Sequence, residues 1–352
     1  MYSPTWLSQV LVYPTGQWQA VAVENQLADT LRSQAWGITP ENVDAAIKAR
    51  SQLLQAIYPA FSQLSDQLHL QPTQLLETLW NLWLPLAIQI AAYRRHQQAP
   101  FIQGILGGQG TGKTTLTAIL TLILSQLGYR TLGLSLDDLY KTYGDRLSLK
   151  KQDPRLVWRG PPGTHDIELG LSVLDQLRQA NLNTLITVPR FDKSLWGGAG
   201  DRTKPEIVQG VDIVLFEGWF VGVRPIHPAA FDTAPPPIDT AADREFARDM
   251  NVQLQNYLPL WQRLDKLILL YPRNYQHSLE WRRQAEHQMI ATGKSGMIDA
   301  EIEKFVKYFW RSLHPDLFIK PLTSYPSYVD LVIEINPDHA VGAVYCPTDA
   351  AL

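Results

Sequence analysis

The sequence predicts an α/β protein in which helices cover both faces of a mainly parallel sheet, a three-layer arrangement, preceded by a helical region. One observation is that short β-prone apolar runs alternate with amphipathic segments of helical length after residue 97. Parallel strands require such helical crossovers. The other is that residues 1–96 are rich in Leu, Gln, Ala and Trp and carry apolar residues at helical spacing. We therefore expect a helical region over 1–96 and an α/β domain over 97–352.

The composition of the 352-residue chain narrows the possible functions. A net charge of -3 provides no basic excess, which disfavours nucleic acid as the main partner. The single cysteine, Cys346, excludes an intramolecular disulfide and a cysteine-based zinc site. The first residues, MYSPTWLSQVLVYPTG, lack the pattern of a secretory or transit peptide. We expect a soluble, cytoplasmic protein of undetermined oligomeric state.

The helical region contains two segments with clear helical periodicity, residues 41–58 and 72–93. Each begins near a proline that a first helical turn tolerates. The most apolar stretch, residues 79–92, is interrupted by polar residues and a proline and is shorter than the roughly 20 residues of a membrane span. We expect no membrane partner, and we expect Trp80 and Trp83 to be core or docking contacts.

The α/β domain shows its elements in alternation. The expected strands are 101–106, 131–136, 184–188, 211–216, 267–271 and 329–335, and the expected helices include 116–127, 169–179 and 246–258. Two long interruptions, 194–210 and 221–243, break this pattern. Because long loops in compact domains are usually functional or disordered, we interpret the first as functional and leave the second open.

A glycine-rich segment joins the first strand to the following helix and satisfies G-x-x-x-x-G-K-[ST]. Its glycines allow backbone N–H groups to converge on phosphate oxygens, and the helix N-terminus adds a favourable dipole. Lys113 supplies a charge to the β- and γ-phosphates, and Thr114 can reach Mg²⁺. The residues expected to bind ATP are Gly107, Gly108, Gln109, Gly110, Thr111, Gly112, Lys113, Thr114 and Thr115.

Acidic residues follow two of the expected strands. Asp137 and Asp138 follow the second strand, and ligands of open parallel sheets lie at the carboxyl ends of strands. One of the pair could accept the proton of an attacking hydroxyl, whereas capping of a turn is the alternative. Glu217 follows the strand 211–216 directly, as the metal-binding acid of a Walker-B motif does. We expect Thr114 and Glu217 to hold Mg²⁺.

Two polar clusters resemble a pocket for a small anionic acceptor. One is Arg159 to Asp166, RGPPGTHD, and the other is Pro189 to Ser194, PRFDKS. Their cations Arg159, Arg190 and Lys193 could bind a carboxylate, although each could also be a solvated surface charge or part of a structural salt bridge. His165 is as consistent with a core hydrogen bond as with a substrate contact.

A charged segment, residues 279–286, precedes the sequence Gly293-Lys294-Ser295-Gly296. A basic helix followed by a glycine-flanked lysine suits a lid that closes over a transferring phosphate. We expect this lid at about residues 273–300.

The sequence resembles the plant-type D-glycerate 3-kinases, a branch of the phosphoribulokinase, uridine kinase and pantothenate kinase group of P-loop kinases. The resemblance lies in GGQGTGKTT, SLDDLY, RGPPGTHD, PRFDKS, GAGDR, FEGW and WRRQAE, which occur in the order of the family. It implies phosphorylation of D-glycerate by ATP, with Asp137 as the general base. The family has an aromatic residue where this chain has Leu139, and Cys346 alone excludes the intrachain thiol switch of some plant relatives.

The resulting hypothesis is in-line transfer from ATP to D-glycerate. Asp137 deprotonates the terminal hydroxyl, while Lys113 and Arg282 stabilise charge on the phosphoryl group. The residues expected to bind the substrate are Asp138, Arg159, His165, Asp166, Arg190 and Lys193. A related kinase acting on a nucleoside, pentose phosphate or pantothenate is the alternative, and a nucleotide-sensing ATPase is a further one.

Overall fold

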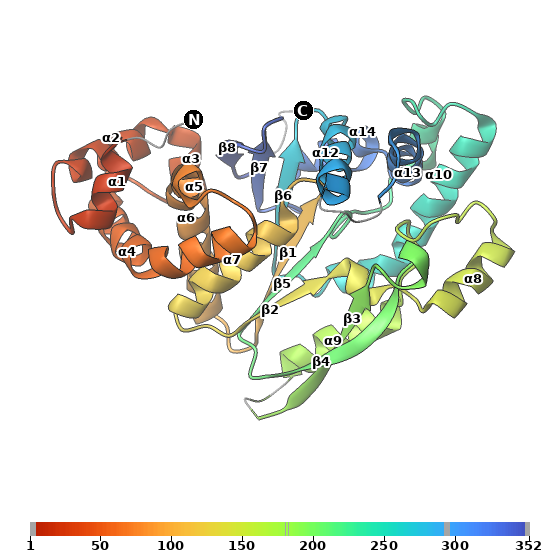
Figure 1. Ribbon diagram of the computed structural model, residues 1–352, viewed down its shortest axis with the longest axis horizontal. Helices are drawn as coiled ribbons and strands as arrows, with labels where there is room; N and C mark the ends of the chain where they lie inside the picture. Colours follow the sequence, from red (N-terminus) through yellow and green to blue (C-terminus); the bar gives the residue numbers. More distant parts are fainter. Residues whose placement is uncertain (1–4, 180, 182, 292–295, 349–352) are drawn as a thin grey trace.

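The structure is a computed structural model that describes residues 5–179, 181, 183–291 and 296–348. Its centre is a six-stranded sheet of spatial order β2-β5-β1-β6-β7-β8 (Figure 1), in which β8 is antiparallel to β7 and the other pairs are parallel. The strands are β1 (Phe101–Gly107), β2 (Thr131–Ser135), β5 (Ile213–Gly218), β6 (Lys266–Pro272), β7 (Leu331–Ile335) and β8 (Val341–Tyr345). Every residue of β1 and β7 is buried, as expected when helices cover both faces. The mainly parallel three-layer fold is therefore confirmed.

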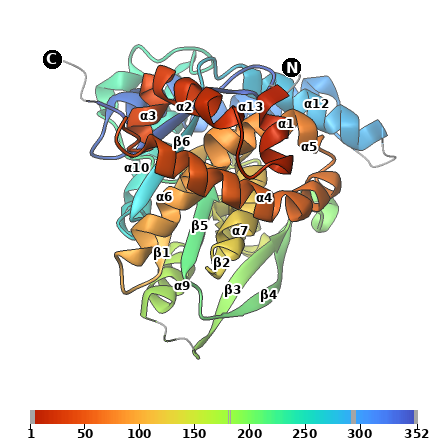
Figure 2. The same ribbon diagram turned by 90° about the vertical axis from the view of Figure 1, so that its left-hand side faces the viewer.

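The N-terminal helices form a layer on one face of this sheet, and Figure 2 shows them in front of it. They are α1 (Thr5–Val12), α2 (Trp18–Ala28), α3 (Thr30–Ala35), α4 (Val43–Gln67), α5 (Pro72–Thr78), a π-helical turn η1 (Leu79–Trp83) and α6 (Leu84–Arg95). Their apolar side chains share one hydrophobic cluster with α7 (Lys113–Gln126) and with residues of the central strands. The predicted helical region is thus present as a covering layer, with Trp80 and Trp83 buried in it.

The helix predicted over residues 72–93 is present and contains the most apolar stretch of this layer. Helices α5, η1 and α6 form one 24-residue helix, Pro72–Arg95, that by length and composition alone could cross a membrane. Pro85 lies inside this helix, directly after the π-helical turn η1, and does not end it. In this fold 61% of its most apolar window is buried. Contacts with the core therefore account for its composition.

The opposite face of the sheet is covered by helices that follow the first crossover. They are α9 (Ile167–Gln179), α10 (Ala241–Gln253), the 3₁₀ turn η5 (Leu254–Tyr257), α11 (Leu258–Trp261) and α14 (Pro315–Phe318). Their apolar residues form a second large cluster with the other side of the sheet. The helix expected over 246–258 is in fact divided among α10, η5 and α11. The segment 221–243, left open above, has Phe231 and Ile238 buried in this cluster.

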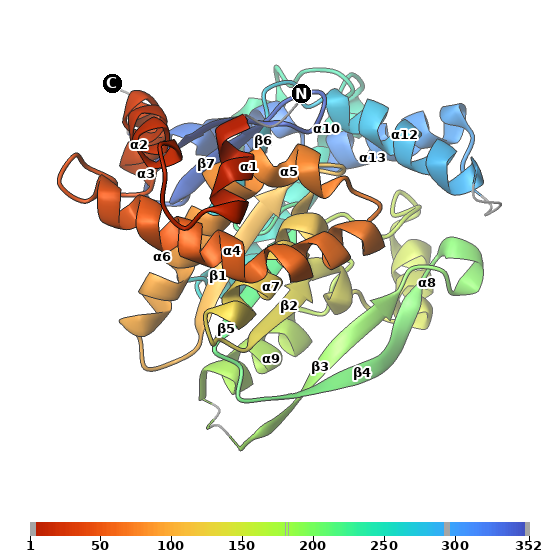
Figure 3. The ribbon, with the colours of Figure 1, turned by 60° about the vertical axis from the view of Figure 1, so that its left-hand side comes forward.

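The third predicted strand does not belong to the central sheet. Its segment forms β3 (Leu185–Asp192), which pairs antiparallel with β4 (Asp201–Gln209) in a separate hairpin, visible in Figure 3. The predictions of a parallel strand at 184–188 and of a long loop at 194–210 were therefore wrong. Strand pairing is a contact between distant residues, and the polar sequence of β4 carries no buried strand pattern. Strand β8 was also not predicted from the sequence.

Three further helices lie around the carboxyl ends of the strands. They are α8 (Tyr143–Gln152), α12 (His277–Ala291) and α13 (Asp299–Ser312). Side chains of α8 contact the β3–β4 hairpin, where Arg146 donates a hydrogen bond to the Ala199 carbonyl at 2.8 Å. α12 packs against α13. These elements surround the edge of the sheet at which the predicted functional residues lie.

Candidate active site

The phosphate loop connects the end of β1 to the start of α7, and residues 107–115 run from the last residue of β1 to the first turn of α7. Gly110 and Gly112 have backbone φ angles of 79° and 85°, in the left-handed region that glycine adopts readily. The Lys113 ammonium donates a hydrogen bond to the Gly108 carbonyl at 2.8 Å. The loop therefore presents backbone N–H groups, a helix N-terminus and one ammonium to the same space, which is the arrangement that binds phosphate.

Two side chains from distant parts of the sequence hold this loop. The Trp281 side chain of α12 covers Gly110 so closely that a Cβ atom there would lie 2.6 Å from the Trp281 Cβ. The Trp281 ring stacks on His339 with ring centroids 4.6 Å apart, and His339 donates a hydrogen bond to the Gly110 carbonyl. Trp281 Nε1 also donates to the Pro337 carbonyl at 2.9 Å. Sequence reasoning missed both residues, although Trp281 begins the motif WRRQAE.

The strand-end acids lie beside the phosphate-loop lysine. Strands β2 and β5 are adjacent, and Ser135 pairs in register with Glu217. Asp137 follows in the 3₁₀ turn η2 (Leu136–Leu139), where its Oδ2 lies 2.6 Å from the Lys193 Nζ. Lys113 interacts electrostatically with both Glu217 and Asp137. The structure therefore brings these four charged side chains together.

This charged cluster shifts the pKa of its members in different directions. Burial raises the pKa of Glu217, and the nearby Lys113 only partly offsets this effect. Burial also favours a higher pKa for Asp137, but the ion pair and hydrogen bond with Lys193 outweigh it and leave that pKa below its usual value. The pKa of Lys113 is lowered by burial, against the opposing effect of the two carboxylates. Of the two acids Asp137 and Glu217, Asp137 therefore stays ionised more readily.

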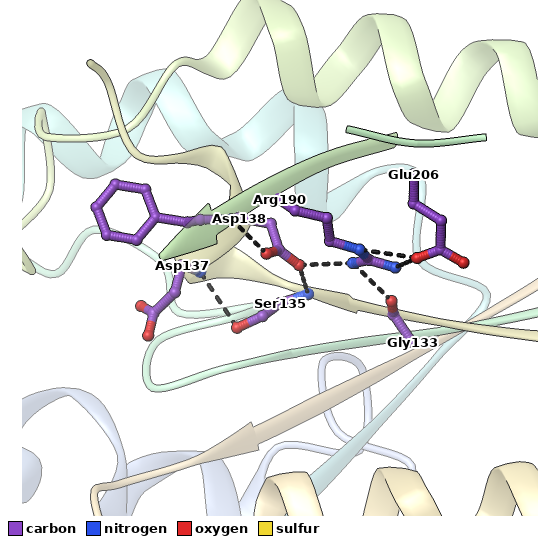
Figure 4. A network of polar contacts seen from close by, with 7 residues as sticks. Gly133, Ser135, Asp137, Asp138, Arg190 and Glu206 are labelled. Carbon is purple, nitrogen blue, oxygen red and sulfur yellow. Dashed lines mark hydrogen bonds and ion pairs between the residues drawn. The ribbon is translucent and has the colours of Figure 1, made fainter. Parts of the chain in front are cut away.

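Asp138 points away from Asp137 and connects β2 to β3 (Figure 4). Its Oδ2 accepts hydrogen bonds from the Ser135 backbone N–H at 3.0 Å and from Arg190 Nη1 at 2.8 Å, and its Oδ1 accepts from the Phe191 N–H at 3.3 Å. The bond to Ser135 forms one half of a capping box. Asp138 therefore caps this turn, which is the alternative role that the sequence allowed for one of the two adjacent aspartates.

Arg190 belongs to the same network (Figure 4). Besides Asp138, its guanidinium contacts the Glu206 carboxylate, with Nε at 2.9 Å from Oε2, and donates to the Gly133 carbonyl at 3.1 Å. The side chain therefore joins the hairpin to the end of β2. Asp166 is engaged similarly, with its Oδ2 2.7 Å from the Arg202 Nη2.

His165 lies beside the ionised carboxylate in a buried aromatic cluster. Its ring stacks on Tyr140 with centroids 4.4 Å apart, and burial lowers the pKa of His165 to about 3, so the imidazole is neutral near pH 7. The Tyr140 hydroxyl hydrogen-bonds to Asp137. Sequence reasoning assigned no role to Tyr140, although it ends the motif SLDDLY.

The partner of His165 determines which ring nitrogen carries the proton. Its Nδ1 lies 2.8 Å from the hydroxyl of Tyr257, and that hydroxyl already accepts a hydrogen bond from the Gly163 N–H at 2.9 Å. Because a buried hydroxyl needs an acceptor for its own proton, Tyr257 donates to Nδ1. The proton of His165 therefore resides on Nε2, which is buried and has no hydrogen-bond partner among the residues that the structure describes.

Arg159 borders the same cluster from the other side. Its guanidinium lies 5.9 Å from the ring centroid of Tyr140 and 5.5 Å from that of Phe191. It donates to the carbonyls of Gly198 and Ala199 at 2.7 and 2.9 Å through a single nitrogen, Nη1. Arg159 thus has no carboxylate partner in the described part of the chain.

Arg282 and the expected lid lie on α12. The Arg282 guanidinium forms an ion pair with Glu286 and lies 5.5 Å from the Phe305 ring centroid on α13. Among the described residues, Arg282 therefore contacts its own helix and α13, and it forms no ion pair with the phosphate loop. Lys294, the glycine-flanked lysine of the expected lid, lies outside the described residues.

Comparison with known proteins identifies the family. No family model matches the chain. The chain is 30% identical over 252 residues to chloroplastic D-glycerate 3-kinase of Arabidopsis thaliana, an alignment that covers 68% of the chain and 53% of that protein. It is also 32% identical over 218 residues to the uncharacterized kinase mug58 of Schizosaccharomyces pombe. That alignment covers 60% of the chain and 78% of that protein. The chain belongs to the family of P-loop kinases that includes plant-type D-glycerate 3-kinase.

A solved structure supports the same assignment for this family member. D-glycerate 3-kinase from Cryptococcus neoformans superposes with a TM-score of 0.66 at 28% sequence identity, over 74% of the chain and 96% of that structure. The aligned part of the chain thus spans about half the length of the Arabidopsis relative and nearly all of the Cryptococcus structure. The resemblance noted from the sequence motifs is confirmed.

Proposed function

We propose that this protein transfers the γ-phosphoryl group of ATP to the 3-hydroxyl of D-glycerate, giving 3-phospho-D-glycerate and ADP. The observation that carries the proposal is the position of Asp137, which pairs with Lys193 at 2.6 Å and interacts with the phosphate-loop Lys113. A carboxylate between a phosphate site and an exposed cation suits a base for a small anionic alcohol. The glycerate kinases among the relatives support this choice of acceptor.

On the nucleotide side, the loop 107–115 and Lys113 would bind the phosphates and stabilise charge on the migrating group. Thr114 and Glu217 would hold Mg²⁺, which supplies charge neutralisation to the β- and γ-phosphates when bound. The residues fit this ion: Thr114 is exposed at the start of α7, and Glu217 lies beside the loop lysine. No cluster of three or more His, Cys, Asp or Glu occurs among the described residues. Mg²⁺ in such kinase sites takes one or two protein ligands plus phosphates and water.

On the acceptor side, Asp137 would take the proton from the 3-hydroxyl as that oxygen attacks the γ-phosphorus. The bond from this phosphorus to the bridging oxygen breaks at the same time, and its electron pair leaves on ADP. The Tyr140 hydroxyl would hold the Asp137 carboxylate in position through its hydrogen bond. Lys193 keeps Asp137 ionised, so that it is ready to accept a proton at neutral pH.

The remaining contacts suggest which side chains bind the glycerate carboxylate and second hydroxyl. We assign Arg159, Lys193 and the Nε2–H of His165 to this task. Arg159 has no carboxylate partner among the described residues, Lys193 is 64% exposed beside Asp137, and His165 Nε2 has no hydrogen-bond partner there. Asp138, Asp166 and Arg190 are ion-paired with one another or with other residues. We therefore assign them to positioning of the pocket, in place of the direct substrate contacts expected from the sequence.

The test is a coupled assay of ADP release with a panel of acceptors: D-glycerate, uridine, ribulose 5-phosphate and pantothenate. We expect turnover with D-glycerate and formation of the 3-phosphate, identified by ³¹P NMR. The Lys113→Ala variant should abolish the signal, which controls for contaminating kinases. Turnover of another panel member without turnover of D-glycerate would refute the proposed acceptor, and ADP release that needs no acceptor would refute the kinase assignment.

A further inference from the structure

A cavity of about 280 Å³ lies within the N-terminal helical region, separate from the site described above. Its size is close to the lower end of the range for small-molecule sites, roughly 300–1,000 Å³. Its walls include two indole rings, three side-chain amides and a guanidinium, which belong to Trp6, Trp80, Asn25, Gln26, Asn81 and Arg32. Asn25 is solvent-exposed, so the cavity is open to small solutes.

A buried arginine lies directly behind this wall. Arg50 is only 2% exposed, its guanidinium lies 5.1 Å from the Trp80 ring centroid, and its Nη1 donates to the Gln26 Oε1 at 2.9 Å. Burial, with a smaller effect from Arg32, lowers the pKa of Arg50 to about 9, so it remains charged at neutral pH. Arg50 forms no ion pair with a carboxylate in the described ranges of the chain. A buried cation without a counter-charge is costly.

A second arginine, Arg32, lines the same cavity. Its Nη atoms contact the Asp29 carboxylate and the Gly342 carbonyl, the latter at 3.0 Å, whereas its Nε is buried without a hydrogen-bond partner in the part of the chain that the structure describes. Gly342 belongs to β8. The cavity therefore lies where the helical layer meets the edge of the sheet, a preferred place for ligand sites.

The charge around the cavity is positive at its buried end. Arg32 neutralises Asp29 by direct pairing, which leaves Arg50 as the uncompensated buried charge. The other acid in the lining, Glu77, is solvent-exposed, so water screens its charge. One uncompensated positive charge matches one negative charge on a ligand better than the two of a phosphate monoester.

We propose that this cavity binds a small organic monocarboxylate. The carboxylate accepts hydrogen bonds from the side-chain amides of the wall beside Arg32, and Arg50 supplies the compensating charge from behind Gln26. The faces of Trp6 and Trp80 contact the carbon skeleton of the ligand. The site is independent of the proposed kinase reaction, because none of these residues belongs to the phosphate loop or to the acidic cluster.

The test is thermal unfolding of the full chain with sodium lactate or sodium propionate as probe, against sodium chloride at the same ionic strength. A ligand that binds the folded state raises the melting temperature in a saturable way. We expect such a rise at millimolar probe for the unmodified protein and for Arg95→Met. Arg95 is an exposed arginine of the same region, so this variant controls for the lost charge. Arg50→Met should lose the response.

Arg50→Met should fold, because it removes a charge that is costly to bury and its flexible thioether chain can fill the same apolar space. Asn81→Leu provides a second variant that fills the cavity and leaves Arg50 in place, and it should also lose the response. Absence of any saturable effect of either probe on the unmodified protein would overturn the proposal. An unchanged response in the folded Arg50→Met and Asn81→Leu proteins would overturn it equally.

Discussion

The two adjacent aspartates should respond differently to the same substitution. Asp137→Asn preserves size but removes the group that we propose accepts the proton from the substrate hydroxyl. A positioned general base contributes about 10²- to 10⁴-fold to a rate, so turnover should fall by that factor, or about 3–5 kcal/mol of transition-state stabilisation. Lys193, the ion-pair partner, is 64% exposed, so stability should change by less than about 1 kcal/mol.

Asp138→Asn should instead affect the free energy of unfolding. This carboxylate is only 9% exposed and accepts three hydrogen bonds, one from the Arg190 guanidinium. A hydrogen bond to a charged group contributes roughly 1.5–3 kcal/mol, so we expect a loss of about 2 kcal/mol in stability. Turnover at low temperature should stay within about tenfold of the unmodified enzyme.

The comparison requires three measurements on each variant: ADP release at saturating substrates, titration with a fluorescent ATP analogue, and urea unfolding. Asp137→Asn should bind the analogue normally and unfold normally while turnover collapses. The reasoning would be refuted if Asp137→Asn retained turnover within tenfold of the unmodified enzyme. It would also fail if Asp138→Asn lost turnover to the same extent without any loss of stability.

Three other predictions follow from the same contacts. Lys193 holds the pKa of Asp137 below its usual value, and the base is lost as pH falls through that pKa. Lys193→Met should therefore shift the acid limb of kcat/KM to higher pH, measured as a pH profile. Gly110→Ala should lower the melting temperature of the nucleotide-free protein, because its Cβ would meet a tryptophan side chain at a positive φ, whereas Gly108→Ala, with open space around its Cβ, should not. His165 should remain neutral with its proton on Nε2 from pH 5 upward, and ¹⁵N NMR showing titration near pH 6.5 would contradict the buried arrangement.

The sequence predicted the features that depend on contiguous residues. The phosphate loop is a single motif between a buried strand and a helix, so its spacing alone indicates the backbone conformation that glycine permits. Asp137 and Glu217 follow apolar strands directly, and parallel strands align their carboxyl ends at one edge of a sheet. The edge of the sheet at which the phosphate loop and these two acids lie could therefore be predicted from contiguous sequence patterns.

Only the tertiary structure distinguished the roles that neighbouring residues can take. Asp137 and Asp138 have equivalent sequence signals, and what separates them is the position of β3, which directs Arg190 to Asp138 and Lys193 to Asp137. The pairing of β3 with β4 in a separate hairpin was likewise invisible, because strand pairing depends on distant residues.

The contact of Trp281 and His339 with Gly110 shows the same limit over a greater distance. These residues lie more than a hundred positions beyond the phosphate loop, and no periodicity relates them to it. The sequence by itself determined which backbone segments could bind phosphate and which acids would lie near them. The packing of α12 and the β7–β8 turn decided which side chains hold that loop, because such contacts arise only when the sheet and its covering helices have assembled.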